Sequence, residues 1–291
     1  MWGDEKQEKT RKSKKNFIET NRQMLFEKPL TLPEEVPSCV MIYGKDGTGK
    51  TGLSLSVLTD KDIKKGQKIV IVDLDSGNLP LLLEYHKDKV NKHILYRDPV
   101  VWETDDDGMP IINYKETIGH INSIAIAAKN RWKEKGDIKA IILDGGSKLL
   151  KQAEYQMRLD RYIEPAGEVS YRFWAERNKM FQETLELYKN LPFDKYFIMH
   201  EDFVPHLTPP SKEMAAVRQF ANQMMYQKIY CERIDKAVAV EFAATIDKSK
   251  FSIGKEGKRE VFASANKSDE SFKWEPEKIL RHLKPSYAGD D

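Results

Sequence analysis

The sequence predicts an α/β protein whose mostly parallel sheet is covered by helices on both faces. Four short apolar runs, at 38–43, 68–73, 138–143 and 195–199, alternate with longer helical segments. Continuous apolar runs of this length are typical of parallel strands that are buried on both faces. Two later strand-like segments, 237–245 and 260–265, flank a turn-rich stretch and predict a C-terminal antiparallel extension of the sheet.

The remaining segments follow from periodicity and from helix-breaking residues. Helices are expected at about 50–58, 114–135, 215–231 and 275–282, and over 147–190 with an interruption near Pro165 and Gly167. Residues 85–113 are expected to be irregular, and 201–214 to form a loop because they contain three prolines. We expect one domain over residues 37–291.

A basic arm over residues 1–36 precedes this domain. It carries five basic residues close together, and prolines at 29 and 33 interrupt regular structure before the first strand; the basic residues are Lys9, Arg11, Lys12, Lys14 and Lys15. Such a cluster can contact phosphate groups, and it can equally be a solvated tail. The formal net charge of the whole chain is only +2, which does not by itself indicate a nucleic-acid partner.

Composition indicates a soluble protein in the cytoplasm. The chain has 291 residues, of which 40% are hydrophobic and 32% charged, and no apolar run is long enough to span a bilayer. The N-terminal residues lack the apolar stretch of a secretory signal. Cys39 and Cys231 are far apart in the sequence and are expected to be buried thiols rather than a disulfide. No membrane partner is expected.

Residues 44–51 carry the most specific signal in the chain. Their sequence, GKDGTGKT, fits the pattern GxxxxGK[ST], follows an apolar strand and precedes a predicted helix. Glycines let the backbone turn its N–H groups toward phosphate oxygens, the lysine reaches the β- and γ-phosphates, and the threonine hydroxyl binds magnesium. This predicts a site for ATP with Mg²⁺ at Gly44, Lys45, Asp46, Gly47, Thr48, Gly49, Lys50 and Thr51.

Two carboxylate positions complete the predicted site. Asp144 ends the apolar strand 138–143, where an acidic residue can orient magnesium; capping of the turn at the following glycines is the alternative role. Asp73 and Asp75 alternate past the end of the strand 68–73 and are expected to point to the same side. Asp75 is the preferred base or water-positioning residue, although a purely turn-forming Asp-Ser-Gly is nearly as good an interpretation.

Two further polar positions are weaker candidates. His200 follows the strand 195–199, so it is expected at the sheet edge that faces the nucleotide, where it could sense the γ-phosphate. A structural histidine remains the alternative. Lys267 follows the last strand-like segment and could complete the active site of a neighbouring subunit, or be a surface charge.

Taken in order, these motifs resemble the RecA-like ATPases. In particular, they resemble the small phage and archaeal-virus nucleotide-binding proteins of the Sak-type single-strand annealing group. The resemblance covers about 38–267: GKDGTGKT, then IVDLDSG, AIILDGG, YFIMHED and a β-rich end with ANKSD. It implies a RecA-like fold, with Asp75 as the catalytic carboxylate (commonly Glu in the family), Asp144 as the magnesium residue, His200 as the coupling residue and Lys267 as the intersubunit lysine.

The resemblance also implies an activity and partners. It indicates an ATPase stimulated by single-stranded DNA that acts in recombination, annealing or repair for a virus or mobile element, in a homo-oligomer with sites between subunits. The loops 151–172 and 201–218 would face DNA through Lys151, Arg158, Arg161, Tyr162, Tyr171, Arg172, Lys212 and Arg218. A DNA-packaging or helicase-type motor and a low-turnover nucleotide switch are the alternatives.

Overall fold

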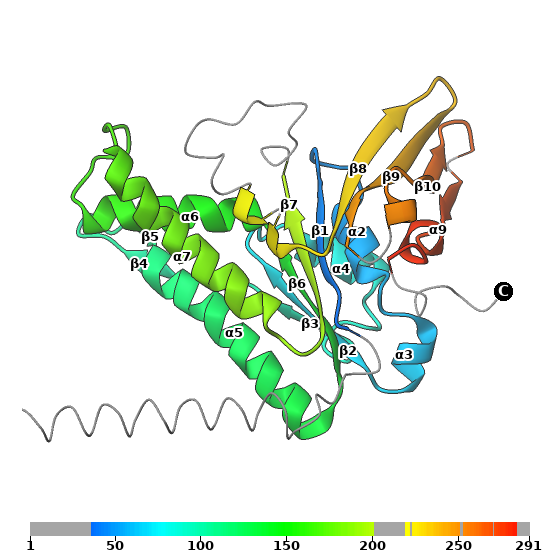
Figure 1. Cartoon of the computed structure of the whole chain (residues 1–291), viewed down its shortest axis with the longest axis horizontal. Coiled ribbons are helices and arrows are strands. Elements are labelled where there is room, and N and C mark those ends of the chain that lie inside the picture. Colours follow the sequence, from blue (N-terminus) through cyan, green and yellow to red (C-terminus); the bar gives the residue numbers. More distant parts are fainter. Residues whose placement is uncertain (1–35, 201–218, 222, 251–252, 270, 284–291) are drawn as a thin grey trace, which may run out of the picture. The chain divides into compact units, whose positions relative to one another are not determined.

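A nine-stranded sheet forms the centre of the protein. The computed structural model describes residues 36–200, 219–221, 223–250, 253–269 and 271–283 (Figure 1). The strands run in the order β11-β10-β9-β8-β1-β7-β6-β2-β3. Their bounds are β1 (Cys39–Gly44), β2 (Lys68–Asp73), β3 (Ile94–Arg97), β6 (Ile138–Asp144), β7 (Asp194–Met199), β8 (Gln227–Asp235), β9 (Ala239–Ser249), β10 (Arg259–Asn266) and β11 (Phe272–Trp274).

The sheet has a parallel and an antiparallel part. Strands β8, β1, β7, β6, β2 and β3 are parallel to one another, whereas β9 pairs antiparallel with β8, β10 with β9 and β11 with β10. The predicted architecture, a mostly parallel sheet with a C-terminal antiparallel extension, is therefore confirmed. Because β10 runs in the same direction as β1, the carboxyl ends of β1, β2, β6, β7 and β10 all lie at one edge.

Helices cover both faces of the sheet. One face packs against α5 (Tyr114–Lys135), α6 (Gly146–Asp160) and α7 (Tyr171–Lys189), and its core includes Phe181, Leu185 and Phe197. The other face packs against α2 (Lys50–Leu55), α3 (Asp60–Lys64), α4 (Asn78–Tyr85) and α9 (Glu277–Leu280). A strand between two such layers must be apolar on both sides, which explains why β1, β6 and β7 consist largely of apolar residues.

Local sequence signals account for the bounds of α5. The side chain of Asn113 accepts a hydrogen bond from Glu116 N at 2.9 Å and so caps α5, and Gly136 ends the helix with φ of 65°. A side-chain acceptor at the first position and a left-handed glycine after the last are the usual helix boundaries. The helix predicted at 114–135 is confirmed with these bounds.

Two regions differ from the prediction. Residues 85–113 are not irregular: they contain β3 and the hairpin of β4 (Trp102–Thr104) and β5 (Pro110–Ile112). The helix expected over 215–231 is wrong for its last part, because Gln227–Asp235 forms β8 and pairs with β1 on one side and β9 on the other. Pairing within the sheet overrides helix propensity there.

The remaining expectations concern the two cysteines, the segments 1–36 and 201–214, and membrane-spanning helices. Cys39 and Cys231 are both buried free thiols, as predicted. The loop expected at 201–214 and nearly all of the arm 1–36 lie outside the described residues. Within the described residues, no helix combines the length and the apolar character needed to cross a membrane.

Candidate nucleotide-binding site

The glycine-rich segment after β1 has the backbone of a phosphate-binding loop. Gly44, Gly47 and Gly49 have φ values of 151°, 67° and 79°, a region that side-chain-bearing residues rarely adopt. A Cβ on Gly44 would lie 2.2 Å from the carbonyl oxygen of Cys231, so β8 packs directly against the start of the loop. The conformation therefore depends on glycine for φ at three positions and for space at the first.

Lys50 is folded back against this loop. Its ammonium group donates hydrogen bonds to the carbonyl oxygens of Gly44 at 3.1 Å and Lys45 at 2.5 Å. Only 6% of the residue is exposed, and this burial lowers the pKa of Lys50. No carboxylate of the described residues lies within ion-pair distance of it. A buried ammonium held by carbonyl groups alone is a site that favours an anion.

Thr51 and Asp144 meet at the beginning of α2. The Thr51 hydroxyl donates to Asp144 Oδ2 at 2.7 Å, and the Asn78 amide donates to the same oxygen at 2.9 Å. Asp144 is 2% exposed; its burial raises the pKa of Asp144 from 3.8 to about 6, with a further contribution from the charges of Asp73 and Asp75. The hydroxyl and the carboxylate that the sequence predicted for magnesium are thus in contact.

These residues fit a nucleotide with magnesium. Among the residues described, no three His, Cys, Asp or Glu side chains gather to hold a metal by themselves. One hydroxyl and one carboxylate beside an anion site suit an ion that takes its other ligands from phosphate and water. When bound, magnesium would supply charge neutralisation at the phosphate oxygens, and Thr51 and Asp144 would hold it.

Asp73 and Asp75 have different environments. Asp73 is fully buried and accepts hydrogen bonds from the backbone N–H groups of Asp75 at 3.1 Å and Asn78 at 2.9 Å, and from the Tyr96 hydroxyl at 3.2 Å. It therefore ties the end of β2 to the first turn of α4. Asp75 is partly exposed, with 23% of its side chain accessible, so it is the more available of the two.

Asp75 belongs to a charged cluster that reaches the glycine-rich loop. His200 Nε2 lies 3.1 Å from Asp75 Oδ2, and His200 Nδ1 lies 2.5 Å from Asp46 Oδ1. Lys148 Nζ lies 3.0 Å from Asp75 Oδ1, and the Ser147 hydroxyl accepts a hydrogen bond from the His200 backbone at 3.0 Å. The imidazole thus connects the loop to the ends of β2 and β7.

The electrostatics of the cluster follow from these contacts. The hydrogen bond to Asp75 raises the pKa of His200 despite partial burial, and the charge of Asp46 adds to the effect. Burial alone would raise the pKa of Asp75, but His200 and Lys148 lower it below its ordinary value. At neutral pH, Asp75 is therefore an ionised carboxylate held by two basic groups.

Sequence reasoning missed several members of this site. Asn78, Ser147 and Lys148 come from the first turns of α4 and α6, and no motif marks them. Asp46 was assigned to the loop only as part of the motif, not as a partner of His200. The available signal was position: polar side chains directly after a strand end at the carboxyl edge lie near the loop.

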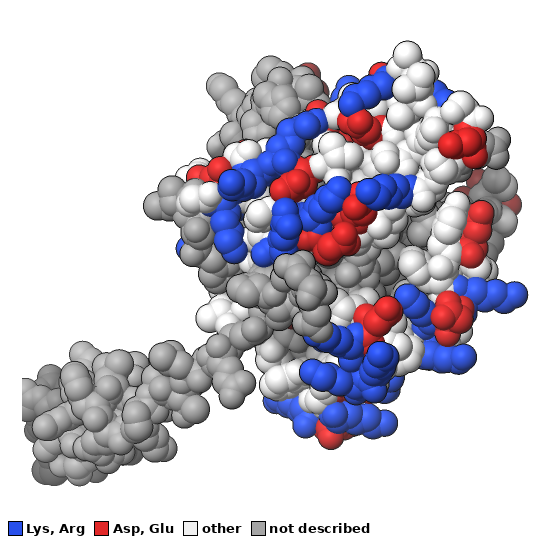
Figure 2. Space-filling model, turned by 90° about the vertical axis from the view of Figure 1, so that its right-hand side faces the viewer, with Lys and Arg blue, Asp and Glu red and all other residues white. Residues whose placement is uncertain are grey.

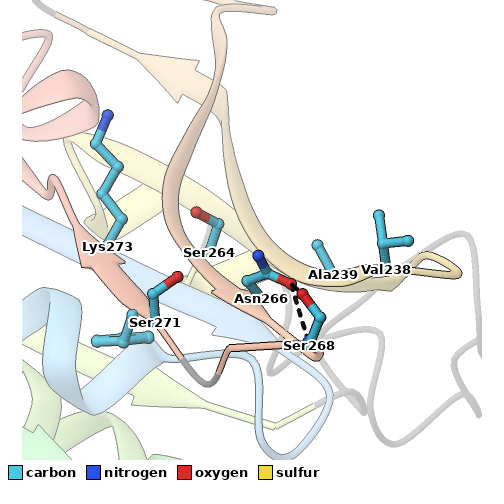
Figure 3. A pocket seen from close by; sticks show the side chains of 8 residues that line it. Val238, Ala239, Ser264, Asn266, Ser268, Ser271 and Lys273 are labelled. Atoms are coloured by element: carbon cyan, nitrogen blue, oxygen red, sulfur yellow. Dashed lines mark hydrogen bonds between the residues drawn. The ribbon is translucent and has the colours of Figure 1, made fainter.

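Lys267 lies at the same edge of the sheet but on other strands. It directly follows β10, which β8 and β9 separate from β1, and its ammonium group donates to the Lys236 carbonyl oxygen at 2.7 Å. Beside it is a surface hollow of about 380 Å³ lined mainly by small and polar side chains (Figure 3): Val238, Ala239, Ser264, Asn266, Ser268, Ser271, Phe272 and Lys273. An intersubunit role for Lys267 stays a prediction.

The connection between α6 and α7 carries exposed aromatic rings. Tyr162 is 97% and Tyr171 76% exposed. Two arginines predicted to contact DNA have partners within the chain: Arg158 donates to the carbonyl oxygens of Glu164 and Gly167, and Arg161 pairs with Glu176. Lys151 and Arg172 are exposed, whereas residues 201–218 lie outside the described ranges.

Basic side chains elsewhere are interspersed with acidic ones. Figure 2 shows Lys and Arg next to Asp and Glu on the side of the molecule that carries β9, β10 and α9. The ion pairs Arg259–Glu232 at 2.9 Å and Lys273–Glu275 at 3.0 Å are examples. Mixed charge of this kind gives little net attraction for a phosphate backbone.

Comparison with known proteins gives a distant likeness to solved structures, among them a KaiC-like protein and a recombinase. No protein-family model and no curated protein matches the chain. The chain is similar to a KaiC-like protein from the archaeon Pyrococcus horikoshii OT3, at 15% identity and a TM-score of 0.44 over 76% of this chain and 84% of that one. It is also similar to the RadB recombinase, at 13% identity and a TM-score of 0.44 over 81% and 90%. At this distance the likeness assigns no function, which has to be argued from the site.

Proposed function

We propose that this chain is a RecA-like ATPase that binds ATP with Mg²⁺ and hydrolyses it. The observation that carries the proposal is Lys50, a buried ammonium without a carboxylate partner among the described residues, set in a loop of left-handed glycines. Phosphate oxygens would replace the two carbonyl groups that now hold it. Thr51 and Asp144 would hold the metal that neutralises the phosphate charge.

The hydrolytic role falls to Asp75. It lies at the end of β2, ionised and within reach of the loop through His200 and Asp46. A carboxylate at this place can orient a water molecule and accept its proton during attack on the γ-phosphate. His200 would then report the presence of that phosphate to the segment that follows β7, because its two ring nitrogens contact the loop and the base at once.

Nucleotide binding by Lys50→Ala tests the proposal. We expect loss of ATP binding and of phosphate release, measured by calorimetry and by a phosphate assay with magnesium. Lys64→Ala is the matched control, because it removes an exposed lysine of α3 that is not part of the loop. Unchanged ATP binding by Lys50→Ala, with the control also unchanged, would contradict the assignment of the phosphate site.

We further propose single-stranded DNA as the partner, in recombination, annealing or repair of a virus or mobile element. The exposed rings of Tyr162 and Tyr171, with the exposed Arg172 directly after Tyr171 and the exposed Lys151 on α6, suit base stacking and backbone contacts. Alanine at either tyrosine should weaken DNA binding by about 1–3 kcal/mol. Tyr85→Ala, which removes an exposed tyrosine on α4, is the control. No binding of the unmodified chain to single-stranded DNA at low salt would refute this part.

A low-turnover nucleotide switch is a second candidate. The contact of His200 with both Asp46 and Asp75 favours it, because an engaged carboxylate is a weaker base than a free one. Asp75→Asn distinguishes the two functions. If Asp75→Asn binds ATP but no longer hydrolyses it, Asp75 is the catalytic base. If the unmodified chain binds ATP but releases phosphate no faster than Asp75→Asn does, the protein is a nucleotide switch. Lys267 would complete the site of a neighbouring subunit in either case.

A further inference from the structure

An aromatic pair on the edge strand β11 packs against the first turn of α2. A Cβ on Gly52 would lie 3.0 Å from Cη2 of Trp274, so the indole contacts the residue directly after Thr51. Phe272, two residues before Trp274 on the same side of the strand, stacks with it at 6.0 Å and 24° between rings. Trp274 is 37% and Phe272 59% exposed, which leaves aromatic surface accessible beside the phosphate-binding loop.

The indole is held in place by its own contacts. Trp274 Nε1 donates to the Ser56 hydroxyl at 3.1 Å, and that hydroxyl donates to the carbonyl oxygen of Gly52 at 2.9 Å. The ring of Phe262 meets the indole edge to face at 5.5 Å and also reaches Gly49 in the loop. Both ring orientation and distance from the loop are therefore set before any ligand binds, which limits the entropy lost on binding.

The order of strands determines which end of a nucleotide reaches this pair. The carboxylates and the imidazole of the site, Asp75, Asp144 and His200, follow β2, β6 and β7, on one side of β1. They mark the end of the phosphate chain where hydrolysis takes place. A nucleotide whose γ-phosphate faces these groups would extend from the loop on the opposite side of β1, toward β8 to β11, where Trp274 and Phe272 lie.

We infer that Trp274 and Phe272 form the subsite for the nucleobase, which stacks on their exposed aromatic surface. The inference rests on the proposed function, since it uses residues 44–51 as the phosphate site. Stacking recognises the face of a base, which all bases have, and not its hydrogen-bonding edge. Because a purine has a larger face than a pyrimidine, the subsite takes purine nucleotides more tightly. Because stacking does not read the hydrogen-bonding edge, the subsite discriminates little between ATP and GTP.

Comparison of ATP with inorganic tripolyphosphate tests the inference. Calorimetry with magnesium measures both affinities for the full chain and for Phe272→Ala, Trp274→Ala and Trp102→Ala. Tripolyphosphate probes the loop alone, because it has no base. We expect the first two variants to bind ATP about 5- to 100-fold more weakly and tripolyphosphate unchanged. Trp102→Ala removes an exposed tryptophan on β4 and should change neither affinity.

The outcomes separate this inference from the function on which it rests. Unchanged ATP affinity in both variants, while tripolyphosphate still binds, overturns the nucleobase subsite alone. Equal losses for ATP and tripolyphosphate also overturn it, because they indicate a disturbed loop. If the unmodified chain binds neither ligand, the phosphate site itself is wrong and both proposals fail. Phe272→Ala remains informative where Trp274→Ala does not fold, since Phe272 is the more exposed ring.

Discussion

Asp144→Asn should make the protein more stable while it removes the magnesium site. Asp144 lies 2% exposed at the end of β6, and its burial raises the pKa from 3.8 to about 6. A raised pKa in the folded state means that folding favours the neutral carboxylic acid. At neutral pH the folded chain must nevertheless hold a buried carboxylate, and this lowers its stability. Asparagine has a similar shape without the charge.

The magnitude follows from the two pKa values. At about 1.4 kcal/mol per pKa unit, the difference between 3.8 and about 6 corresponds to about 3 kcal/mol at pH 8. The unfavourable contribution is absent below pH 3.8, grows as the pH rises and is complete above the folded pKa. At pH 5 it is about half as large, so the gain from Asp144→Asn should also be about half as large there.

Urea denaturation without nucleotide or magnesium measures this effect. The unfolding free energies of the unmodified chain and of Asp144→Asn are compared at pH 8 and pH 5. Asp137→Asn is the control at the other end of the same strand, because the pKa of Asp137 is lowered by Arg131 and its loss should destabilise the chain at pH 8. A variant no more stable than the unmodified chain, or a gain that does not shrink at pH 5, would refute the reasoning.

Three further predictions concern the same site. Gly44→Ala should destabilise the fold far more than Gly47→Ala. Position 47 has space for a Cβ, so its substitution should lower the free energy of unfolding by only about 1 kcal/mol through its φ of 67°. Equal losses of unfolding free energy in urea denaturation would contradict the packing of β8 on the loop. Because the pKa of His200 is raised in the folded chain, protonated His200 stabilises the fold and this contribution is lost as the pH rises from about 6.5 through the raised pKa. The unfolding free energy of the unmodified chain should therefore fall relative to that of His200→Gln over this pH range, and parallel pH profiles of unfolding free energy would contradict this. Lys267→Ala should lose ATPase activity yet regain part of it when mixed with Lys50→Ala, and no recovery would argue against shared sites.

The strands that the sequence predicted well are those that are buried on both faces of the sheet. Strands β2 and β6 consist largely of apolar residues because helices cover both of their faces, and their ends agree with the prediction to within one residue. The first part of β8, up to Cys231, was predicted as helix; the sequence of the strand, QKIYCERID, mixes charged and apolar residues without clear alternation. Its identity as a strand depends on pairing with β1 and β9, which no local pattern encodes.

Some residues of the candidate site could be predicted from local sequence, and others depend on the strand order of the fold. The loop from Gly44 to Thr51 and the carboxylate of Asp144 could be predicted, because chemistry requires particular residue types at a fixed spacing or at a strand end. The contact of Asp46 with His200 could not be predicted, since it joins residues 154 positions apart through the order of strands. The position of Trp274 against Gly52 is likewise a product of the antiparallel extension.

The antiparallel extension has a mechanical consequence for an assembly of these chains. Its strand β10 places Phe262 against Gly49 of the loop and ends directly before Lys267, while β8 places the backbone of Cys231 against Gly44. A neighbour that engages Lys267 would therefore load the same strands that hold the chain's own phosphate loop. In such an assembly, these paired strands would connect the contact with the neighbour to the chain's own phosphate loop.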